Sequence, residues 1–397
     1  MYTETLTRRA LFAASAGTIA GATLLANANA QEPKPVQPRA GSKPDEGEPL
    51  PPNQRVGIAI VGIGAYASEQ IIPSFAETRM CRLAGFVTGD VAKGRTFAEK
   101  HGVSAQNVFT YDQMAQLAQR PDIDAVYVIT PNALHREHTE AAAKAGKHVL
   151  CEKPMATNPK DAEAMIKACA DANKILMIGY RAQYEPYNLR AIEMCRTGKL
   201  GRIVSLTSEH GRTANPAEKR DQWRLKKALS GGGSLPDIGI YSLNAARYLT
   251  GEEPAEIWAT ISSPKNDPRF QEVEATVHFT LRFPSGILAN CISSYDWSEV
   301  KRGQVFGTEA SLTLDPLSDY YRHNLSVSRK EPGGETPIEQ KILIPEKNQF
   351  ALQLDHFAEC VRTGKTPKTP GEEGLRDVRY IEAIYRSARE GKSVKVS

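Results

Sequence analysis

Residues 55–67 read Arg-Val-Gly-Ile-Ala-Ile-Val-Gly-Ile-Gly-Ala-Tyr-Ala, and this stretch decides the fold of the first half of the chain. The apolar run 55–61 predicts a buried strand, and the G-x-G-x-x-A pattern after it opens a helical stretch through Phe75. In that context the glycines let the backbone approach a pyrophosphate at a helix N-terminus. The pattern therefore predicts a dinucleotide-binding turn made of Gly62, Ile63, Gly64, Ala65, Tyr66 and Ala67.

Buried strands alternate with helices after this turn. Strands are predicted at 81–87, 124–129 and 148–151, and the helix before the last one runs to Lys144 with Gly146 as its C-cap. This alternation is typical of a parallel, doubly wound sheet, whose ligands bind at the carboxyl ends of the strands. At or near those ends we expect cofactor contacts from Thr88, Tyr111, Pro131, Asn132, Glu152 and Lys153.

The residues after the second strand bear on the choice of nucleotide. An NAD enzyme normally places an acid at this strand end to bind the ribose 2′-hydroxyl. Thr88 occupies that position, and Lys93 and Arg95 follow it, which favours the 2′-phosphate of NADP. Asp90 is a rival acid that would suit NAD, and the two cations could instead form an exposed helix face. We predict NADP as the cofactor.

The second half of the chain is richer in strands. Antiparallel strands are predicted at 273–283, 287–295 and 311–315. Between them and the first half, Gly231-Gly-Gly-Ser-Leu-Pro-Asp-Ile-Gly-Ile-Tyr241 predicts a helix with Ser234 as its N-cap. Asp237 and Tyr241 are four residues apart and should share a helix face. Taken locally, Asp237 could equally be a capping-box acid and Tyr241 a core aromatic.

Several motifs together resemble the Gfo/Idh/MocA oxidoreductase family, and within it the glucose–fructose oxidoreductases. They are GIGAY (62–66), TPN (130–132), CEKPMAT (151–157), IGYR (178–181), QWRL (222–225), GGGSLPDIGIYSLN (231–244), RYLTGEEP (247–254) and NQFALQLDHFAE (348–359). The resemblance covers nearly all of the chain from Val56 onward. It implies an α/β chain with an N-terminal Rossmann dinucleotide-binding domain and a C-terminal α+β domain with a large, mainly antiparallel sheet.

The resemblance also implies roles for single residues. Lys153 matches the lysine that orients the sugar and the nicotinamide, Asp237 the active-site acid, and Tyr241 the tyrosine acid/base. The Lys153 ammonium would favour the phenolate that a base requires. Further cofactor contacts are implied for Arg181, Trp223, Arg224 and Tyr320.

The N-terminus predicts export. Arg8 and Arg9 precede a weakly apolar run, 11–26, and the residues 26–30 offer two A-x-A cleavage sites. This layout is typical of a twin-arginine signal peptide. A membrane anchor needs ~20 strongly apolar residues, and this run is shorter and only weakly apolar. The predicted parts are a signal peptide (1–30), a proline-rich arm or linker (31–54), a Rossmann NADP-binding domain (55–176) and a C-terminal substrate and oligomerisation domain (177–397). We expect a periplasmic homo-oligomer, a dimer or a tetramer, without a membrane anchor.

Composition excludes other classes of protein. The formal net charge is +4, of which one unit lies in residues 1–30, and no basic block indicates a nucleic-acid partner. The six cysteines form no C-x-x-C pair, and export of an already folded chain argues against disulfides, so we expect buried thiols. His135 and His138 lack a further ligand at metal-binding spacing, so no metal site is predicted.

Location narrows the expected reaction. NADP used outside the cytoplasm must travel tightly bound inside the folded protein and be recycled in place. We therefore expect one sugar to be oxidised at C1 to its lactone and a second, a ketose or an aldose, to be reduced to a polyol. A simple NADP-dependent sugar dehydrogenase, an NAD-retaining glycosidase of the same family and a non-catalytic sugar-binding protein remain as alternatives.

Overall fold

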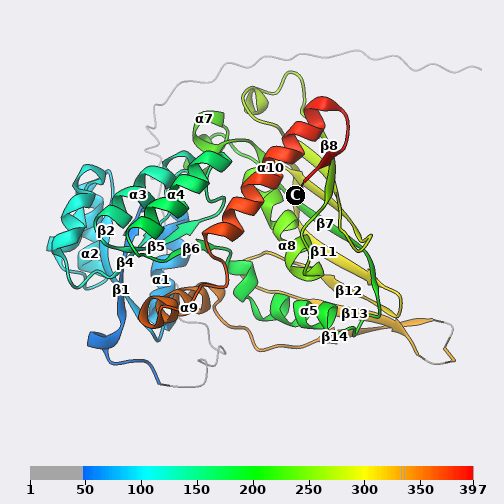
Figure 1. The fold of residues 1–397 in the computed structure, drawn as a ribbon, viewed down its shortest axis with the longest axis horizontal. Coiled ribbons are helices and arrows are strands. Elements are labelled where there is room, and N and C mark those ends of the chain that lie inside the picture. Colours follow the sequence, from blue (N-terminus) through cyan, green and yellow to red (C-terminus); the bar gives the residue numbers. More distant parts are fainter. Residues whose placement is uncertain (1–47, 332, 335, 397) are drawn as a thin grey trace, which may run out of the picture. The chain divides into compact units, whose positions relative to one another are not determined.

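Two sheets organise the part of the chain that the computed structural model describes, residues 48–331, 333–334 and 336–396 (Figure 1). The predicted signal peptide lies outside the described residues, and so does the proline-rich arm up to residue 47.

The first sheet is parallel and has the strand order β3-β2-β1-β4-β5-β6 in the described chain. Its central strands are apolar runs with every residue buried, as expected for a parallel sheet covered on both faces. The strands are β1 (Val56–Val61), β2 (Cys81–Val87), β3 (Val108–Phe109), β4 (Ala125–Val128), β5 (His148–Glu152) and β6 (Leu176–Gly179). The longer helices of this half are α2 (Val91–Lys100), α3 (His135–Lys144) and α4 (Pro159–Asp171). The strand order and the crossover helices confirm the predicted Rossmann fold.

The second sheet is mainly antiparallel, as predicted. Its order in the described chain is β14-β13-β12-β11-β7-β10-β9-β8-β15, and β10 pairs with β7 in parallel. The strands are β7 (Ile203–Thr213), β8 (Glu256–Ser262), β9 (Thr276–Arg282), β10 (Leu288–Ser294), β11 (Asp296–Gly307), β12 (Ala310–Leu314), β13 (Leu325–Lys330), β14 (Pro337–Ile342) and β15 (Val394–Lys395). Predicted and observed strands agree in place and differ by one to three residues at their ends.

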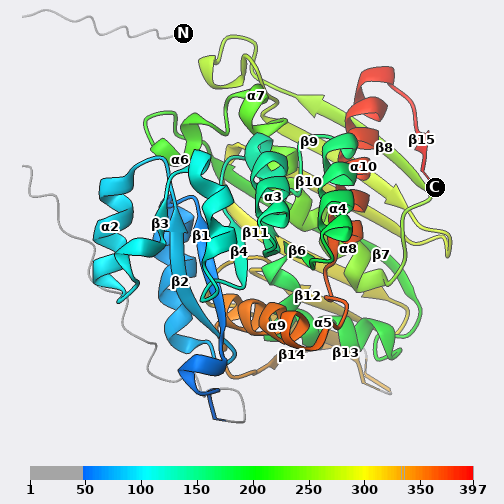
Figure 2. The same ribbon diagram turned by 60° about the vertical axis from the view of Figure 1, so that its left-hand side comes forward.

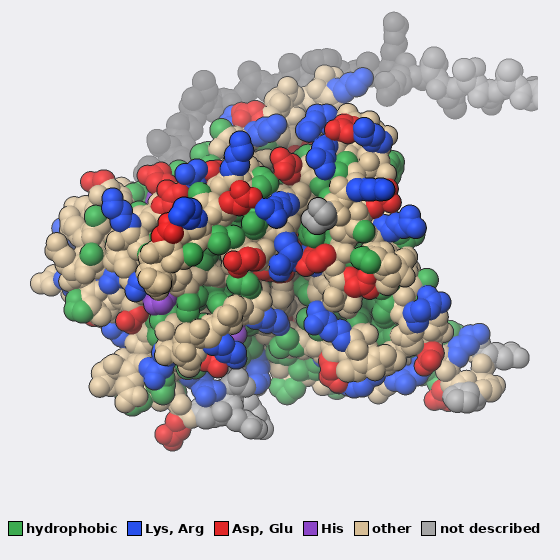
Figure 3. Space-filling view, viewed as in Figure 1, with side chains coloured by type: hydrophobic (Ala, Val, Ile, Leu, Met, Phe, Trp, Pro, Cys, Tyr) green, Lys and Arg blue, Asp and Glu red, His purple; other side chains and the backbone are tan. Residues whose placement is uncertain are grey.

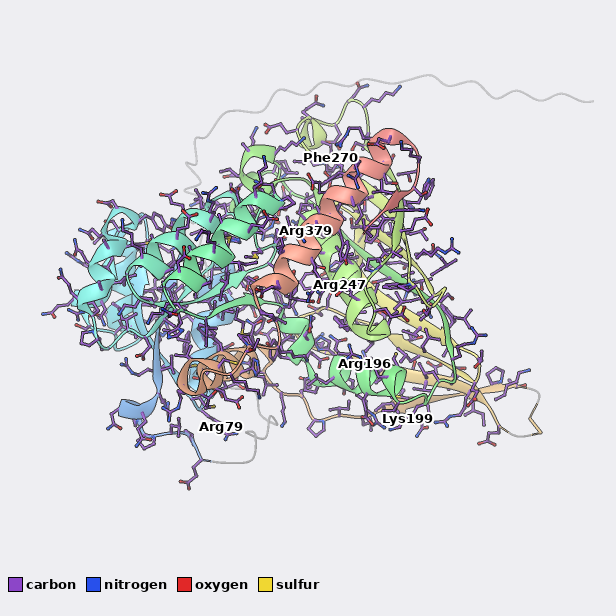
Figure 4. The ribbon with its side chains drawn as sticks, in the orientation of Figure 1. Arg79, Arg196, Lys199, Arg247, Phe270 and Arg379 are labelled. Carbon is purple, nitrogen blue, oxygen red and sulfur yellow. The ribbon has the colours of Figure 1, made fainter. Side chains whose placement is uncertain are left out.

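Helices cover one face of this sheet, as Figures 1 and 2 show: α5 (Pro186–Arg196), α8 (Ile240–Thr250) and α10 (Gly371–Glu390). A buried ion-pair network joins α8 to α10. Arg247 of α8, labelled in Figure 4, lies 2.6 Å from Asp377 and 2.9 Å from Glu373. The short α6 (Lys219–Gln222) and α7 (Lys227–Ser230) precede α8. The shared ion pairs hold α8, which carries Tyr241, against α10.

The helix α9 (Gln349–Thr363) packs on the first sheet instead of the second. Its Phe350, Leu354 and Phe357 are buried in the same cluster as Val56 and Ile58 of β1. Their i, i+4, i+7 spacing gives the helix one apolar face. The late part of the chain therefore completes the core of the first domain.

The opposite face of the large sheet exposes apolar side chains. Trp258, Leu288 and Phe306 are 46%, 43% and 37% exposed, and they alternate with buried neighbours along β8, β10 and β11. On the face drawn in Figure 3, Lys/Arg and Asp/Glu side chains are interspersed. None of the described helices is both long and apolar enough to span a bilayer.

The helix starts directly after Ser234, as predicted, but the expected cap by the serine side chain is wrong. The Ser234 hydroxyl makes no cap to the helix backbone and pairs with the Ser293 hydroxyl at 3.1 Å. The helix begins with a π-helical turn, Leu235–Gly239, and α8 follows it. The backbone amides at the start of this helix donate to the Glu274 carboxylate instead, Gly233 N at 2.8 Å and Leu235 N at 3.0 Å.

Candidate active site

The glycine-rich turn leaves β1 with open space in front of it. Gly62 has φ +99°, and a Cβ there would lie 2.8 Å from the carbonyl oxygen of Ile129, so only glycine fits. At Gly64 a Cβ would meet no atom within 4 Å. A π-helical turn (Ala67–Ile71) and the short α1 (Ile72–Ser74) follow. The turn therefore leaves room for a ligand to approach its backbone at Gly64.

The residues predicted to read the 2′-position lie at different distances from the turn. Lys93 and Arg95 are both exposed on α2, but only the Lys93 amine, among these two, donates to the turn, to the Ile63 carbonyl at 2.6 Å. Thr88 is buried, and its hydroxyl accepts from Asp90 N at 3.2 Å. The Asp90 carboxylate caps α2 by accepting from Lys93 N at 2.9 Å. Asp90 is thus occupied as a helix cap, and Lys93 is the cation that reaches the turn.

The loops after β4 and β5 are tied together by a buried histidine. His135 faces the carbonyl oxygens of Thr130 and Pro154 at 2.9 and 3.0 Å, and burial lowers its pKa to about 4. Pro131 precedes Asn132, whose side chain donates to Ser230 O at 2.8 Å and so reaches α7. His135 therefore holds the TPN and EKP motifs in one arrangement.

His138 and Tyr111 fill the space beside these loops. His138 bonds the Thr130 hydroxyl at 3.0 Å. The Tyr111 ring stacks on His138 with centroids 4.7 Å apart and lies against Gly89, at the end of β2. Tyr111 thus lies by the strand end at which the nucleotide is expected.

Glu152, the last residue of β5, is buried. It accepts a short hydrogen bond from the Tyr127 hydroxyl, and its other oxygen accepts from Lys153 N at 3.2 Å. Burial raises its pKa, although Lys153 opposes that shift. Glu152 therefore fixes the backbone from which the Lys153 side chain projects.

Lys153, Asp237 and Tyr241 converge, as the resemblance implies. The Lys153 amine donates to the Asp237 carbonyl at 2.7 Å and lies 3.9 Å from its carboxylate. The same amine is 4.4 Å from the centroid of the Tyr241 ring. Lys153 and the Asp237–Tyr241 segment, distant in sequence, thus form one cluster at the carboxyl end of β5.

The Asp237 carboxylate is surrounded by positive charge and is not a capping-box acid. Arg224 and Arg212 approach Oδ2 at 3.1 and 3.5 Å, and the Tyr295 hydroxyl donates to it at 2.6 Å. Burial alone would raise the pKa of Asp237, but Arg224, Lys153 and Arg212 outweigh it and hold the pKa well below its ordinary value. Asp237 is therefore a permanent carboxylate.

Tyr241 is enclosed on both sides of its ring. The ring stacks on His210, with centroids 5.1 Å apart and planes at 23°. Arg181 Nη2 donates to its hydroxyl at 3.1 Å. Burial lowers the pKa of His210 well below its usual value, so the imidazole is neutral. Tyr241 is thus not a simple core aromatic, because its hydroxyl faces a guanidinium.

The remaining predicted residues link this cluster to the glycine-rich turn. The Arg181 guanidinium lies 4.6 Å from the Tyr320 ring, and Tyr320 is 6.0 Å from Tyr66 of the turn. Trp223 lies 4.5 Å from the Arg224 guanidinium. Arg181, Tyr320 and Tyr66 therefore form a continuous path between the turn and Tyr241.

Four residues of the site were missed by sequence reasoning: His210, Arg212, Asp221 and Tyr295. His210 and Arg212 are two apart on β7, so period-2 alternation could have placed both on the sheet face that covers the site. Asp221 binds the Arg212 guanidinium at 2.6 and 2.8 Å and balances its charge. Only the pairing of strands could have revealed Tyr295.

This arrangement suits chemistry that moves a proton at a hydroxyl group. A phenol held against cations can accept a proton from a substrate hydroxyl and later return it. An ammonium beside the phenol can orient the substrate oxygen that gives up or receives this proton.

Comparison with known proteins agrees with this geometry. Residues 56–180 match the family described as "Oxidoreductase family, NAD-binding Rossmann fold", and residues 192–396 match "Oxidoreductase family, C-terminal alpha/beta domain". The chain belongs to the Gfo/Idh/MocA oxidoreductase family. Both the predicted family and the predicted fold class are confirmed.

Relatives of this family member match it over most of their length. The NADP(+)-dependent D-xylose 1-dehydrogenase of Haloarcula marismortui is 31% identical, over 86% of this chain and 93% of its own. The 1,5-anhydro-D-fructose reductase of Ensifer adhaerens is 26% identical, over 85% and 97%. The crystal structure of aldose-aldose oxidoreductase from Caulobacter crescentus, complexed with glycerol, is 47% identical with a TM-score of 0.82, over 86% and 100%.

Proposed function

We propose that this oxidoreductase is exported to the periplasm and couples two sugars through one tightly bound NADP. It oxidises an aldose at C1 to its lactone and reduces a second sugar, a ketose or an aldose, to a polyol. The observation that carries the proposal is the convergence of Lys153, Asp237 and Tyr241 at the end of the path that begins at the glycine-rich turn. The similarity to an aldose-aldose oxidoreductase supports it.

The residues present fit NADP. The space at Gly64 accommodates phosphates, and the Lys93 amine lies at the Ile63 carbonyl, where it can turn to a 2′-phosphate. Asp90 is already bound to the helix backbone, which argues against its holding a ribose diol. When bound, the nucleotide supplies the nicotinamide that takes up and returns a hydride.

The side chains then divide the proton chemistry. Tyr241 takes the proton of the C1 hydroxyl of the donor sugar and later gives it to the carbonyl oxygen of the acceptor. Lys153 orients that oxygen. Asp237 remains ionised and holds Lys153 in place.

The decisive experiment uses purified protein without added nucleotide. An aldose and a second sugar should give lactone and polyol in equal amounts, with parallel lines in double-reciprocal plots. An absolute requirement for added NADP, consumed one-for-one with sugar, would overturn the coupling and leave a simple dehydrogenase.

Denaturing the same preparation identifies its nucleotide. Released NADP is the expected result. Released NAD would favour the NAD-retaining glycosidase, and no nucleotide would indicate a diffusible cofactor.

Export has its own test. Replacing Arg8 and Arg9 with lysine should leave the precursor in the cytoplasm, because the predicted signal depends on the arginine pair. Normal periplasmic accumulation of that variant would rule out the twin-arginine route.

A further inference from the structure

The buried guanidinium of Arg181 forms no ion pair with a carboxylate in the described chain. Its donors reach neutral acceptors: the carbonyls of Ser318 and Asp319 at 2.5 and 2.8 Å, the Gln349 amide oxygen at 2.7 Å and the Tyr241 hydroxyl at 3.1 Å. Arg181 is only 2% exposed, and its Nε has no acceptor. Because a buried charge is normally balanced by an opposite one, this site is suited to an anion formed during the reaction.

The other groups around Tyr241 do not place a positive charge on its hydroxyl oxygen. The titratable groups that face it are Lys153 at the end of β5, Arg181 after β6, His210 on β7, Asp237 in the preceding turn and Tyr320 after β12. Lys153 lies 3.9 Å from the Asp237 carboxylate, which Arg224 and Arg212 also approach, and it faces the ring of Tyr241 and not its hydroxyl. His210 is neutral, and burial raises the pKa of Tyr320, so it remains a phenol. Arg181 is therefore the cation that donates to the Tyr241 oxygen. Among the described residues no carboxylate lies within salt-bridge distance of it, and Glu152 and Glu185 act on it only from farther away.

We propose that Arg181 is a catalytic residue that stabilises the phenolate of Tyr241. This inference rests on the proposed function, in which Tyr241 is the base. In the oxidative half-reaction the O–H bond of the C1 hydroxyl breaks, and its proton joins the Tyr241 oxygen. The electron pair of that bond forms the C1=O bond, while the C1 hydrogen leaves with two electrons to the nicotinamide. The negative charge that Tyr241 carries before this step is matched by Arg181.

The surroundings of Arg181 hold it ready for this role. Two carbonyls and the Gln349 amide fix its Nη1 and Nη2 from segments far apart in the chain, so little reorganisation accompanies proton transfer. Gln349 itself is held by its own donations to the carbonyls of Asp319 and Tyr320.

The first test is the pH dependence of sugar oxidation in single-turnover experiments. Arg181→Gln should slow the reaction near neutral pH by about 10- to 100-fold, the range for a hydrogen bond to a charged group. The loss should shrink at higher pH, because the rising limb of the profile moves up by about one to two pH units. A loss that is the same at every pH would overturn the proposal and leave Arg181 a structural residue.

A second pair of variants leaves Arg181 in place. Gln349→Glu puts a carboxylate against the guanidinium and should shift the profile in the same direction. Gln349→Met loses the same amide donors without adding charge, so it should not shift the profile. A shift of equal size in both variants would contradict the electrostatic role.

The two hypotheses fail separately. Tyr241→Phe should lower turnover by about 10²- to 10⁴-fold at all pH values, and near-normal turnover would refute the proposed base. If Tyr241→Phe is slow but Arg181→Gln shows no pH-dependent recovery, only the Arg181 role is refuted. Tyrosinate absorbance gives an independent readout: the contribution removed by Tyr241→Phe should appear at higher pH in Arg181→Gln than in the wild type.

Discussion

Lys93 and Arg95 both follow β2 closely in the sequence, but their side chains point in different directions from α2. Side chains two apart on an α-helix point about 200° apart, so both cannot face one phosphate directly. Both residues are exposed, but the Lys93 amine reaches the Ile63 carbonyl at 2.6 Å, while Arg95 makes no hydrogen bond or ion pair with a described residue. The cationic pair that the sequence suggests is therefore reduced to one residue beside the turn.

Nucleotide selectivity tests this difference. Lys93→Ala should weaken NADP binding by about 10- to 100-fold, since a hydrogen bond to a charged group contributes about 1.5–3 kcal/mol, and should leave NAD binding nearly unchanged. Arg95→Ala is the matched control and should change neither Kd by much. Calorimetric titration of nucleotide-free protein measures both, and equal losses for NADP and NAD would remove Lys93 from 2′-phosphate recognition.

Sequence motifs identified single residues of the site where those residues lie within one short stretch of the chain. The EKP lysine and the Asp237–Tyr241 pair could be named because each lies in a short, specific pattern. The partners of Asp237 could not, because Arg212 lies on β7 and Tyr295 lies between β10 and β11, and these segments meet only through sheet pairing. The direct donor to Tyr241 also differs from expectation, since Arg181 and not Lys153 contacts its oxygen.

At the scale of elements, the segment that carries Asp237 and Tyr241 is anchored by hydrogen bonds to the Glu274 carboxylate. Gly233 packs so closely that a Cβ would lie 2.0 Å from the carbonyl oxygen of Glu274. The Glu274 carboxylate accepts from Gly233 N and Leu235 N and from the Tyr385 hydroxyl at 3.0 Å. The sequence predicted a flexible glycine loop with a serine cap, because no local pattern reveals an acceptor forty residues later.

Removing this acceptor should loosen the segment. Glu274→Gln leaves one oxygen for donors that now use two, so it should lower the thermal midpoint by a few degrees, in line with ~1–3 kcal/mol for an unsatisfied buried group. Turnover should fall with it. Glu272→Gln is the control, because that exposed carboxylate pairs with Lys226 at 2.7 Å, and it should change neither value. Equal stability of the two variants would show that Glu274 does not hold the segment.

At the scale of the whole molecule, buried His135 makes stability depend on pH. Its pKa is lowered from 6.5 to about 4, so the unfolded chain binds the proton more readily. A depressed folded-state pKa contributes stability that is present above 6.5 and is lost as pH falls through about 4. That difference corresponds to roughly 3 kcal/mol.

Thermal unfolding between pH 7 and 4 checks this contribution. His135→Gln should make the midpoint less sensitive to pH over that interval, even if the variant is less stable at pH 7. His278→Gln, on an exposed position of β9, should keep the wild-type slope. An unchanged slope in His135→Gln would assign the acid sensitivity to other groups.

The outer face of the large sheet bears on assembly. Leu288 and Phe306 lie on the two strands that flank β7, on either side of Ser205, and both expose apolar surface. We expect this face to be covered in a dimer or tetramer. Light scattering should show Leu288→Asp with Phe306→Asp shifting to monomer, while Leu343→Asp, off the sheet, should not. A monomeric wild type would refute the expectation.

The docking of α9 has a consequence for the order in which the protein is made. The core around Val56 and Ile58 is complete only when Phe350, Leu354 and Phe357 pack into it. The ribosome synthesises those residues some three hundred positions after β1. The first domain therefore leaves the ribosome without the helix that completes its core. The core of the first domain is therefore completed only after almost the entire chain has been translated.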